Sequence, residues 1–269
     1  MKIDNHILTD IPFEESPNHS GNIQPDTIVM HYTAGASAES SIRTLCNPDS
    51  SASAHVVIGR DGSITQLVPF NVKAWHAGKS SHSGRTGLNN YSIGIELDNA
   101  GILEQAGDAY VSWFGRKYNQ DEVLEAKHRN EDFKRYWHLF TEAQITAATE
   151  LCEALLKQYD ISYIVGHEEI SPGRKHDPGP AFPLDKLRER LLEKDRSKDE
   201  ADESIEKATV AVDALNFRDA PGTEGNKISK PLKRGTKLKI LERQGSWYKV
   251  IAEQEGWVMG SFIDKNEQS

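Results

Sequence analysis

Three short runs of β-branched and aliphatic residues constrain the fold of this chain more than any other feature. They are TIVMHYT at 27–33, YSIGIEL at 91–97 and SYIVGH at 162–167. Composition of this kind is typical of buried strands, and the first run passes into an Ala-Gly-Ala break at 34–36. Two further β-rich runs flank Arg60-Asp61-Gly62, and Asp-Gly is the chemistry of a tight hairpin turn. The chain therefore predicts a central β-sheet.

Helical patterns alternate with these strands. Thr141 and Gln144 have the spacing of a capping box, and they predict the start of a long amphipathic helix. Its apolar positions follow at helical spacing: Ile145, Ala148, Cys152, Leu155 and Tyr159. A leucine-rich stretch after Pro183 predicts a shorter helix. The fold class expected is α/β, with a mixed central sheet flanked by helices.

A change of composition divides the chain of 269 residues into two domains. The run KDRSKDEADESIEK is charged and almost free of apolar residues, as expected of a solvated linker. We place the first domain at 1–192, the linker at 193–207 and the second domain at 208–269. The second domain holds short β-rich runs separated by Gly and Pro, which predict a small closed β-barrel.

An insertion at about 99–140 is the least regular part of the first domain. It is rich in Tyr, Trp and Phe. We expect an elaborated loop with a helix packed on the core; the alternative is an aromatic lining for a substrate cleft.

Charge and apolar content exclude several classes of protein. A net charge of −9 argues against sequence-independent binding of nucleic acid, which needs a basic surface. No stretch approaches the roughly 20 apolar residues of a membrane span, and the first residues lack the apolar run of a signal peptide. We therefore expect synthesis in the cytoplasm without a visible signal. The two cysteines, Cys46 and Cys152, form no Cys-x-x-Cys pair and suggest core residues.

Candidate metal ligands lie at two predicted strand ends and in one loop. His31 is near the end of the first strand, His167 ends the third, and Asp177 follows in a Pro- and Gly-rich loop. A catalytic zinc site uses three such ligands and keeps one position open. Taken singly, a histidine at a strand end is more often a hydrogen-bonded structural residue.

Four motifs, in order, give the chain a resemblance to a known family. They are HYTAG around His31, AWHAG at 74–78, SIGIEL around Glu96, and VGHEEISPGRKHDPGPAF at 165–182. The region from about 25 to 190 resembles the type 2 N-acetylmuramoyl-L-alanine amidases, a family that also includes phage lytic amidases and animal peptidoglycan recognition proteins. The resemblance implies their α/β fold and cleavage of the amide bond between N-acetylmuramic acid and L-alanine.

The resemblance also implies a role for each site residue. His31, His167 and Asp177 are expected to bind Zn²⁺, Glu96 to act as general base, and Lys175 to stabilise the oxyanion. Zinc lowers the pKa of bound water from 15.7 to about 7, so a carboxylate nearby can take its proton. A fixed ammonium stabilises the charge of the tetrahedral intermediate. The alternatives are a solvated loop lysine and an exposed strand glutamate.

Three more residues match positions that line the substrate cleft in the family: His55, Trp75 and His76. An aromatic face suits the apolar side of a sugar ring or the peptide stem. For Trp75, packing in the core is the competing interpretation.

The segment at about 208–264 resembles the bacterial SH3-type domains, which commonly bind cell-wall peptide or glycan. The matching features include Leu215 to Arg218, Gly235-Thr236, Trp247 to Val250 and Gly256 to Val258. Trp247, Tyr248 and Trp257 are candidates for a binding groove, although aromatics in small barrels are often half core.

We thus expect a wall hydrolase that acts on peptidoglycan or muropeptides and reaches the wall by an unidentified route. A non-catalytic peptidoglycan receptor is one alternative, but receptors typically lack a metal ligand that this chain retains. A cytosolic amidase that recycles anhydro-muropeptides is another, against which the SH3-type domain argues. The oligomeric state does not follow from the sequence.

Overall fold

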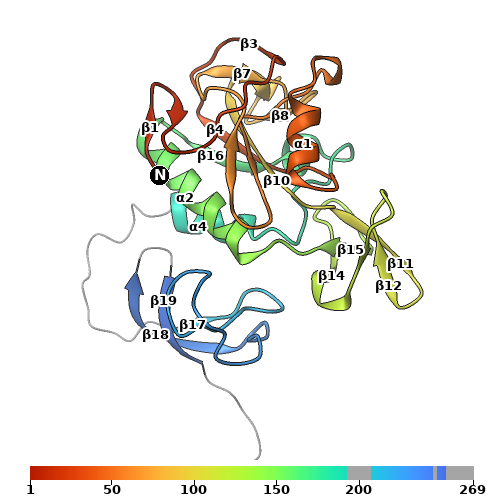
Figure 1. Ribbon diagram of the computed structural model, residues 1–269, viewed down its shortest axis with the longest axis vertical. Coiled ribbons are helices and arrows are strands. Elements are labelled where there is room, and N and C mark those ends of the chain that lie inside the picture. The colour runs from red at the N-terminus through yellow and green to blue at the C-terminus, as the bar shows by residue number, and fades with distance from the viewer. Residues whose placement is uncertain (193–206, 245–246, 253–269) are drawn as a thin grey trace, which may run out of the picture. The chain divides into compact units, whose positions relative to one another are not determined.

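The computed structural model describes residues 1–192, 207–244 and 247–252. The chain divides into two compact units, Met1–Glu200 and Ala201–Ser269. Figure 1 shows the elements of both units. The predicted linker at 193–207 lies outside the described residues, except for Lys207.

A five-stranded sheet forms the centre of the first unit, in the order β16-β4-β10-β5-β6. Its strands are β4 (Thr27–Tyr32), β5 (Val56–Ile58), β6 (Ile64–Gln66), β10 (Ser92–Leu97) and β16 (Tyr163–Gly166). β16, β4, β10 and β5 are parallel neighbours, while β6 returns antiparallel to β5. The strands and the hairpin predicted from the sequence are confirmed, and so is the α/β class.

Both faces of this sheet are covered, as parallel strands require. On one face, Ile28, Met30, Ile93 and Ile95 pack with apolar residues of α2 (Glu142–Gln158) and α4 (Leu184–Leu192) (Figure 1). On the other face, Val29 and Val165 pack with Ile170 of the short helix α3 (His167–Ile170). Alternate residues of β4 therefore serve opposite faces.

Side-chain caps determine where the helices begin. The Thr141 hydroxyl accepts from the Gln144 backbone N–H, and the Gln144 side chain accepts from the Thr141 N–H, so the predicted capping box of α2 is confirmed. Ser37 caps α1 (Ala38–Leu45) in the same way through Ser40.

Small elements surround the sheet of the first unit. Antiparallel pairs form between β1 (Ile3–Asp4) and β2 (Ile7–Leu8), β3 (His19–Asn22) and β7 (Val72–Ala74), and β8 (Ser81–His82) and β9 (Arg85–Thr86). Single 3-10 turns lie at η1 (Pro48–Ser50) and η2 (Leu88–Asn90).

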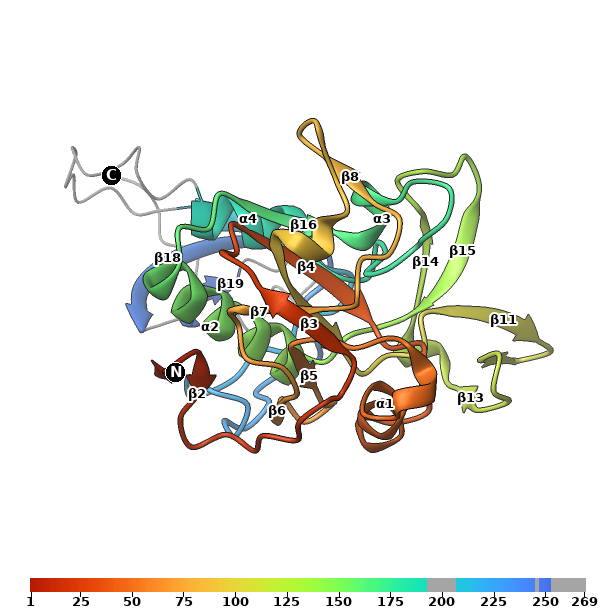
Figure 2. The same cartoon turned by 90° about the horizontal axis from the view of Figure 1, so that it is seen from above.

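The expectation of a loop with a packed helix at 99–140 was wrong. This insertion forms a second, antiparallel sheet in the order β13-β12-β11-β15-β14, with a 3-10 turn η3 (Gln120–Glu122). Its strands are β11 (Ile102–Ala106), β12 (Ala109–Val111), β13 (Lys117–Tyr118), β14 (Val123–Lys127) and β15 (Lys134–His138). Because β11 and β14 each bury only one residue, their apolar alternation is weak in the sequence. Figure 2 shows this sheet beyond the end of the central sheet toward which β4 runs.

The second unit contains a three-stranded antiparallel sheet in the order β17-β18-β19. The strands are β17 (Lys207–Thr209), β18 (Lys237–Gln244) and β19 (Trp247–Ala252), with a register shift between Ile240 and Glu242. The predicted β-rich composition is thus confirmed for these strands. Residues 253–269, which the predicted barrel includes, lie outside the described residues.

Within the described residues, no helix combines the length and apolar character needed to cross a bilayer. The α2 helix has 17 residues and carries charged side chains along its length.

Candidate functional site

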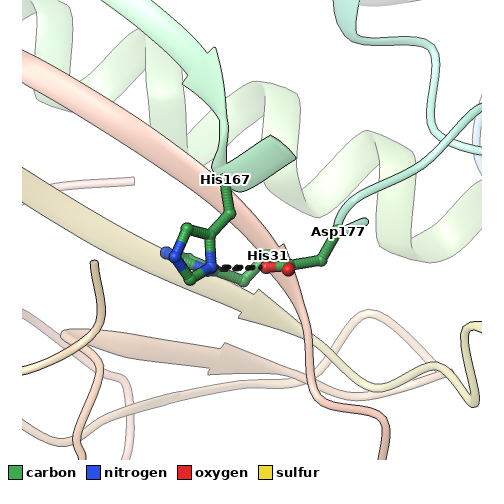
Figure 3. Close-up of side chains that lie close together, drawn as sticks. All are labelled: His31, His167 and Asp177. Carbon is green, nitrogen blue, oxygen red and sulfur yellow. Dashed lines mark hydrogen bonds and ion pairs between the residues drawn. The ribbon is translucent and has the colours of Figure 1, made fainter. Parts of the chain in front are cut away.

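Two histidines and one aspartate from three segments meet at one edge of the central sheet (Figure 3). Nδ1 of His31 lies 2.8 Å from Oδ2 of Asp177 and 3.0 Å from Nδ1 of His167. Nδ1 of His167 lies 3.0 Å from the same Asp177 oxygen. All three side chains are buried, and among the described residues they form a group able to hold a metal ion. The structure thus brings together the three ligands proposed from the sequence.

Strand order explains why the two histidines are neighbours. β16 lies beside β4 in parallel, with Gly166 opposite Met30 in the register. His31 and His167 are the next residues of each segment, so they leave the same edge of the sheet side by side. The contact between these two histidines, which are 136 residues apart in the sequence, therefore follows from the pairing of β4 with β16.

The possible positions of hydrogen atoms on these three side chains show that a cation fits between them. His167 Nε2 lies 3.1 Å from the carbonyl oxygen of Ala77, which can only accept, so the Nε2 carries the hydrogen. In the neutral ring, Nδ1 then directs a lone pair at Asp177 and His31. With Asp177 ionised and both rings neutral, no placement of protons makes all three contacts attractive: two N–H groups would face each other, or a lone pair would face the carboxylate. A metal ion attracts all three atoms at once.

Burial favours the ligand form of His31. Burial, with His167 adding to it, lowers the pKa of His31 to about 4, so the imidazole is neutral at pH 7. Neutral imidazoles and a carboxylate are the forms that bind metal.

Glu96 lies beside His31 in the register of β10 and β4. Its Oε2 is buried and has no hydrogen-bond partner among the described residues. Burial raises the pKa of Glu96 to about 8; Asp177 adds to the increase and Lys175 opposes it. An unpaired buried carboxyl oxygen costs free energy, so its presence next to the metal-ligand group favours a chemical role.

A pocket of about 360 Å³ connects these groups. It is lined by His31, Tyr32, Thr33, Ala34, Leu45, Ala52, Ser53, Trp75, His76, Glu96, His167, Arg174, Lys175, His176 and Asp177. Lys175, proposed from the sequence as an oxyanion partner, is therefore part of the same pocket as Glu96. Trp75 and His76 also line it, and Trp75 donates its indole N–H to the Ser20 hydroxyl at 3.1 Å.

His55 does not line this pocket. Its ring is completely buried, with Nε2 donating to the Val72 carbonyl at 2.9 Å and Nδ1 accepting from the Gly94 N–H at 3.0 Å. Both nitrogens are thus used in holding β5, β7 and β10 together, which corrects the substrate contact expected from the sequence.

The aromatic residues proposed for the second unit are only partly described. Trp247 is half-buried and Tyr248 is exposed on β19. Trp257 lies outside the described residues.

Two pocket features were not anticipated from the sequence. Arg174 donates to the carbonyl oxygens of Ala77 and Lys79, which places a second cation beside Lys175. Trp113, in the insertion, is 77% exposed and donates its indole N–H to the Ala34 carbonyl at 2.7 Å, at the pocket rim. In the sequence, Arg174 stands next to Lys175 and Trp113 lies in an aromatic-rich insertion. Neither fact shows, without the fold, that the residue lies near the pocket.

The insertion supports the loop that carries Asp177. Glu168 is buried; its Oε2 accepts from His128 Nε2 at 2.5 Å and from the Gly179 N–H at 3.1 Å, and its Oε1 lies 2.9 Å from Arg129 Nε. Burial raises the pKa of Glu168 to about 7, and Arg129 opposes this. The Trp137 ring of β15 packs against Gly179, so apolar and ionic contacts act together.

Fold and site together define an α/β protein with a buried two-histidine, one-aspartate group that could hold a metal ion. The family model for N-acetylmuramoyl-L-alanine amidase matches residues 21–180, more than half of the chain. The chain therefore belongs to the N-acetylmuramoyl-L-alanine amidase family. A model for the bacterial SH3 domain matches residues 213–264 in the second unit.

Two curated relatives and one solved structure are similar to parts of this chain. The chain is 35% identical over 169 residues to the N-acetylmuramoyl-L-alanine amidase AmiD of Escherichia coli (strain K12), covering 60% of this chain and 51% of that protein. It is 35% identical over 132 residues to the 1,6-anhydro-N-acetylmuramyl-L-alanine amidase AmpD of Citrobacter freundii, covering 48% and 52%. The chain thus spans about half the length of these relatives. A solved structure of a selenomethionine AmpD derivative is 28% identical, with a TM-score of 0.49, and the match covers 70% of this chain and 98% of that one.

We predict that Gly179→Ala destabilises the first unit more than Gly173→Ala does. Both glycines have positive φ, at +72° and +74°, so each substitution costs about 1 kcal/mol in backbone strain. A Cβ at Gly179 would also lie 2.8 Å from the Trp137 ring, whereas nothing lies within 4 Å at Gly173. Overpacking adds about 1 to 3 kcal/mol. Urea unfolding measures the difference, and equal losses for the two variants would contradict it.

Proposed function

We propose that this chain hydrolyses the amide bond between N-acetylmuramic acid and L-alanine in peptidoglycan or its fragments, with zinc as cofactor. The observation that carries the proposal is the meeting of His31, His167 and Asp177 with the unpaired Glu96 oxygen in one pocket. Family membership supplies the substrate class.

The donor set supports zinc in particular. Two imidazole nitrogens and one carboxylate oxygen match the three protein ligands of catalytic zinc sites. Zinc, when bound, supplies a Lewis acid that polarises a carbonyl and activates water.

The residues of the chain supply the proton transfers and the charge stabilisation. Glu96 takes a proton from the attacking water and returns it to the departing alanine nitrogen, which must be protonated to leave. Lys175, which lines the same pocket, would stabilise the negative charge that develops on the carbonyl oxygen. Burial of Glu96 suits this role, because it brings the pKa of the carboxyl nearer to the operating pH.

The pocket also offers contacts for the rest of the substrate. Trp75 lines the pocket, and the exposed Trp113 contacts the pocket residue Ala34; both supply apolar faces that suit sugar rings. Arg174 and Lys175 offer cations to the carboxylates of the peptide stem.

A recycling role remains a second candidate, because the Citrobacter freundii relative is named a 1,6-anhydro-N-acetylmuramyl-L-alanine amidase. The SH3 domain favours action on the wall, since a binding module raises the local concentration of a polymer substrate. We propose the cell wall as the place of action.

We predict that purified protein binds about one zinc ion and releases new L-alanine amino termini from intact sacculi. Digests of sacculi and of an anhydro-muropeptide, analysed side by side by mass spectrometry, identify the bond and the preferred substrate. Chelation should abolish the activity and zinc should restore it. Protein that binds zinc but cleaves neither substrate would be a receptor, and the enzyme proposal would be rejected.

Glu96→Gln should keep zinc affinity and lower kcat by a factor of about 10² to 10⁴, the usual contribution of a general acid-base group. Glu125→Gln is a suitable control, because Glu125 lies on β14 and does not line the pocket. Turnover of Glu96→Gln within a few-fold of the native value would exclude Glu96 as the base.

Trp247→Ala and Tyr248→Ala should weaken binding to sacculi while leaving hydrolysis of a soluble muropeptide unchanged. The reason is that these residues belong to the SH3 domain and not to the pocket residues. Cosedimentation with sacculi and a soluble-substrate assay measure the two properties. Unchanged cosedimentation of both variants would reject a wall-binding role for this aromatic pair.

A further inference from the structure

A second histidine lies behind the metal ligand His31. Nε2 of His31 is 3.0 Å from Nδ1 of His76, and the two rings meet edge to face at 84°. His76 is itself a pocket residue, but the contact occupies the nitrogen that faces His31. The hydrogen in this contact decides which His31 nitrogen is left with a lone pair.

The far side of the His76 ring shows where its hydrogen lies. Nε2 is 3.3 Å from both the carbonyl oxygen and the hydroxyl oxygen of Ser92. The Ser92 hydroxyl donates to the Leu88 carbonyl at 2.6 Å, so toward His76 its oxygen can only accept. Two acceptors face Nε2, which therefore carries the hydrogen.

A neutral imidazole has a single N–H, so Nδ1 of His76 is an acceptor. The hydrogen between the two rings therefore belongs to Nε2 of His31. This leaves the Nδ1 of His31 with a lone pair directed at Asp177 and His167.

We propose that His76 is a positioning residue that holds His31 in the tautomer required for metal binding, through a relay from Ser92 to His76 to His31. The inference rests on the proposed metal site but not on the proposed substrate. It changes the role expected from the sequence, where His76 was a substrate contact. Both of its nitrogens are paired within the protein.

Backbone packing keeps the His76 ring in this position. A Cβ on Gly94, in β10, would lie 2.4 Å from Cγ of His76, so the ring rests directly against the glycine backbone. The backbone N–H groups of His76 and Ala77 both donate to Oδ1 of Asn89, at 3.1 and 2.7 Å. The acceptor is thus held in place before any metal binds.

Two substitutions of the full-length protein separate this relay from simple packing. His76→Asn places a carbonyl oxygen near the position of Nδ1 and keeps an acceptor for His31. His76→Gln places its amide near the position of Nε2 and loses that acceptor. Zinc affinity, measured by competition with a chelator and without substrate, should be nearly native for His76→Asn and about 10- to 100-fold weaker for His76→Gln.

Equal zinc affinities for the two variants, whether native or weak, would overturn the proposal. Nitrogen-15 NMR of the metal-free native protein supplies an independent readout: His31 should be the Nε2–H tautomer, and an Nδ1–H signal would also overturn it. Neither measurement depends on catalysis, so failure of the proposed hydrolysis would leave both results interpretable.

Discussion

The parallel pairing of β4 with β16 is the contact on which the rest of the site depends. It sets His31 and His167 side by side at the edge where both segments leave the sheet. Parallel pairing in turn requires apolar cover on both faces, which α2 and α4 supply on one side and Ile170 of α3 helps supply on the other. The hydrophobic core therefore determines the position of the metal ligands.

Burying polar groups at that edge costs free energy, and the surrounding structure offsets the cost unequally. Glu168 has partners for both carboxylate oxygens: His128, Arg129 and the Gly179 N–H all contact its carboxylate. Glu96 keeps an oxygen without a partner among the described residues. The hydrogen-bonded carboxyl of Glu168 contacts the Asp177 loop, while the Glu96 carboxyl with its unpaired oxygen lines the pocket and suits chemistry.

The insertion at 99–140 contacts both the Asp177 loop and the border of the pocket. Its strand β15 supplies Trp137 against Gly179, while His128 and Arg129, between β14 and β15, contact Glu168, next to the ligand His167. Trp113, between β12 and β13 of the insertion, donates to the carbonyl of Ala34 at the pocket rim. A segment whose sequence is irregular thus supports the ligand loop and borders the pocket. This could not be read from the sequence, because half-exposed antiparallel strands leave little apolar periodicity.

Local chemistry in the sequence determined the strands at the centre of the first unit, the capping box of α2 and the identity of the candidate ligands, since each depends on residues close together in the chain. Tertiary structure alone decided the roles of the two other histidines. The sequence presents His55 and His76 alike, as residues next to apolar strands. In the fold, His55 joins three strands through its two nitrogens, whereas His76 contacts His31. The reason is physical: a histidine's role depends on which donors and acceptors face its two nitrogens, and those partners come from distant segments.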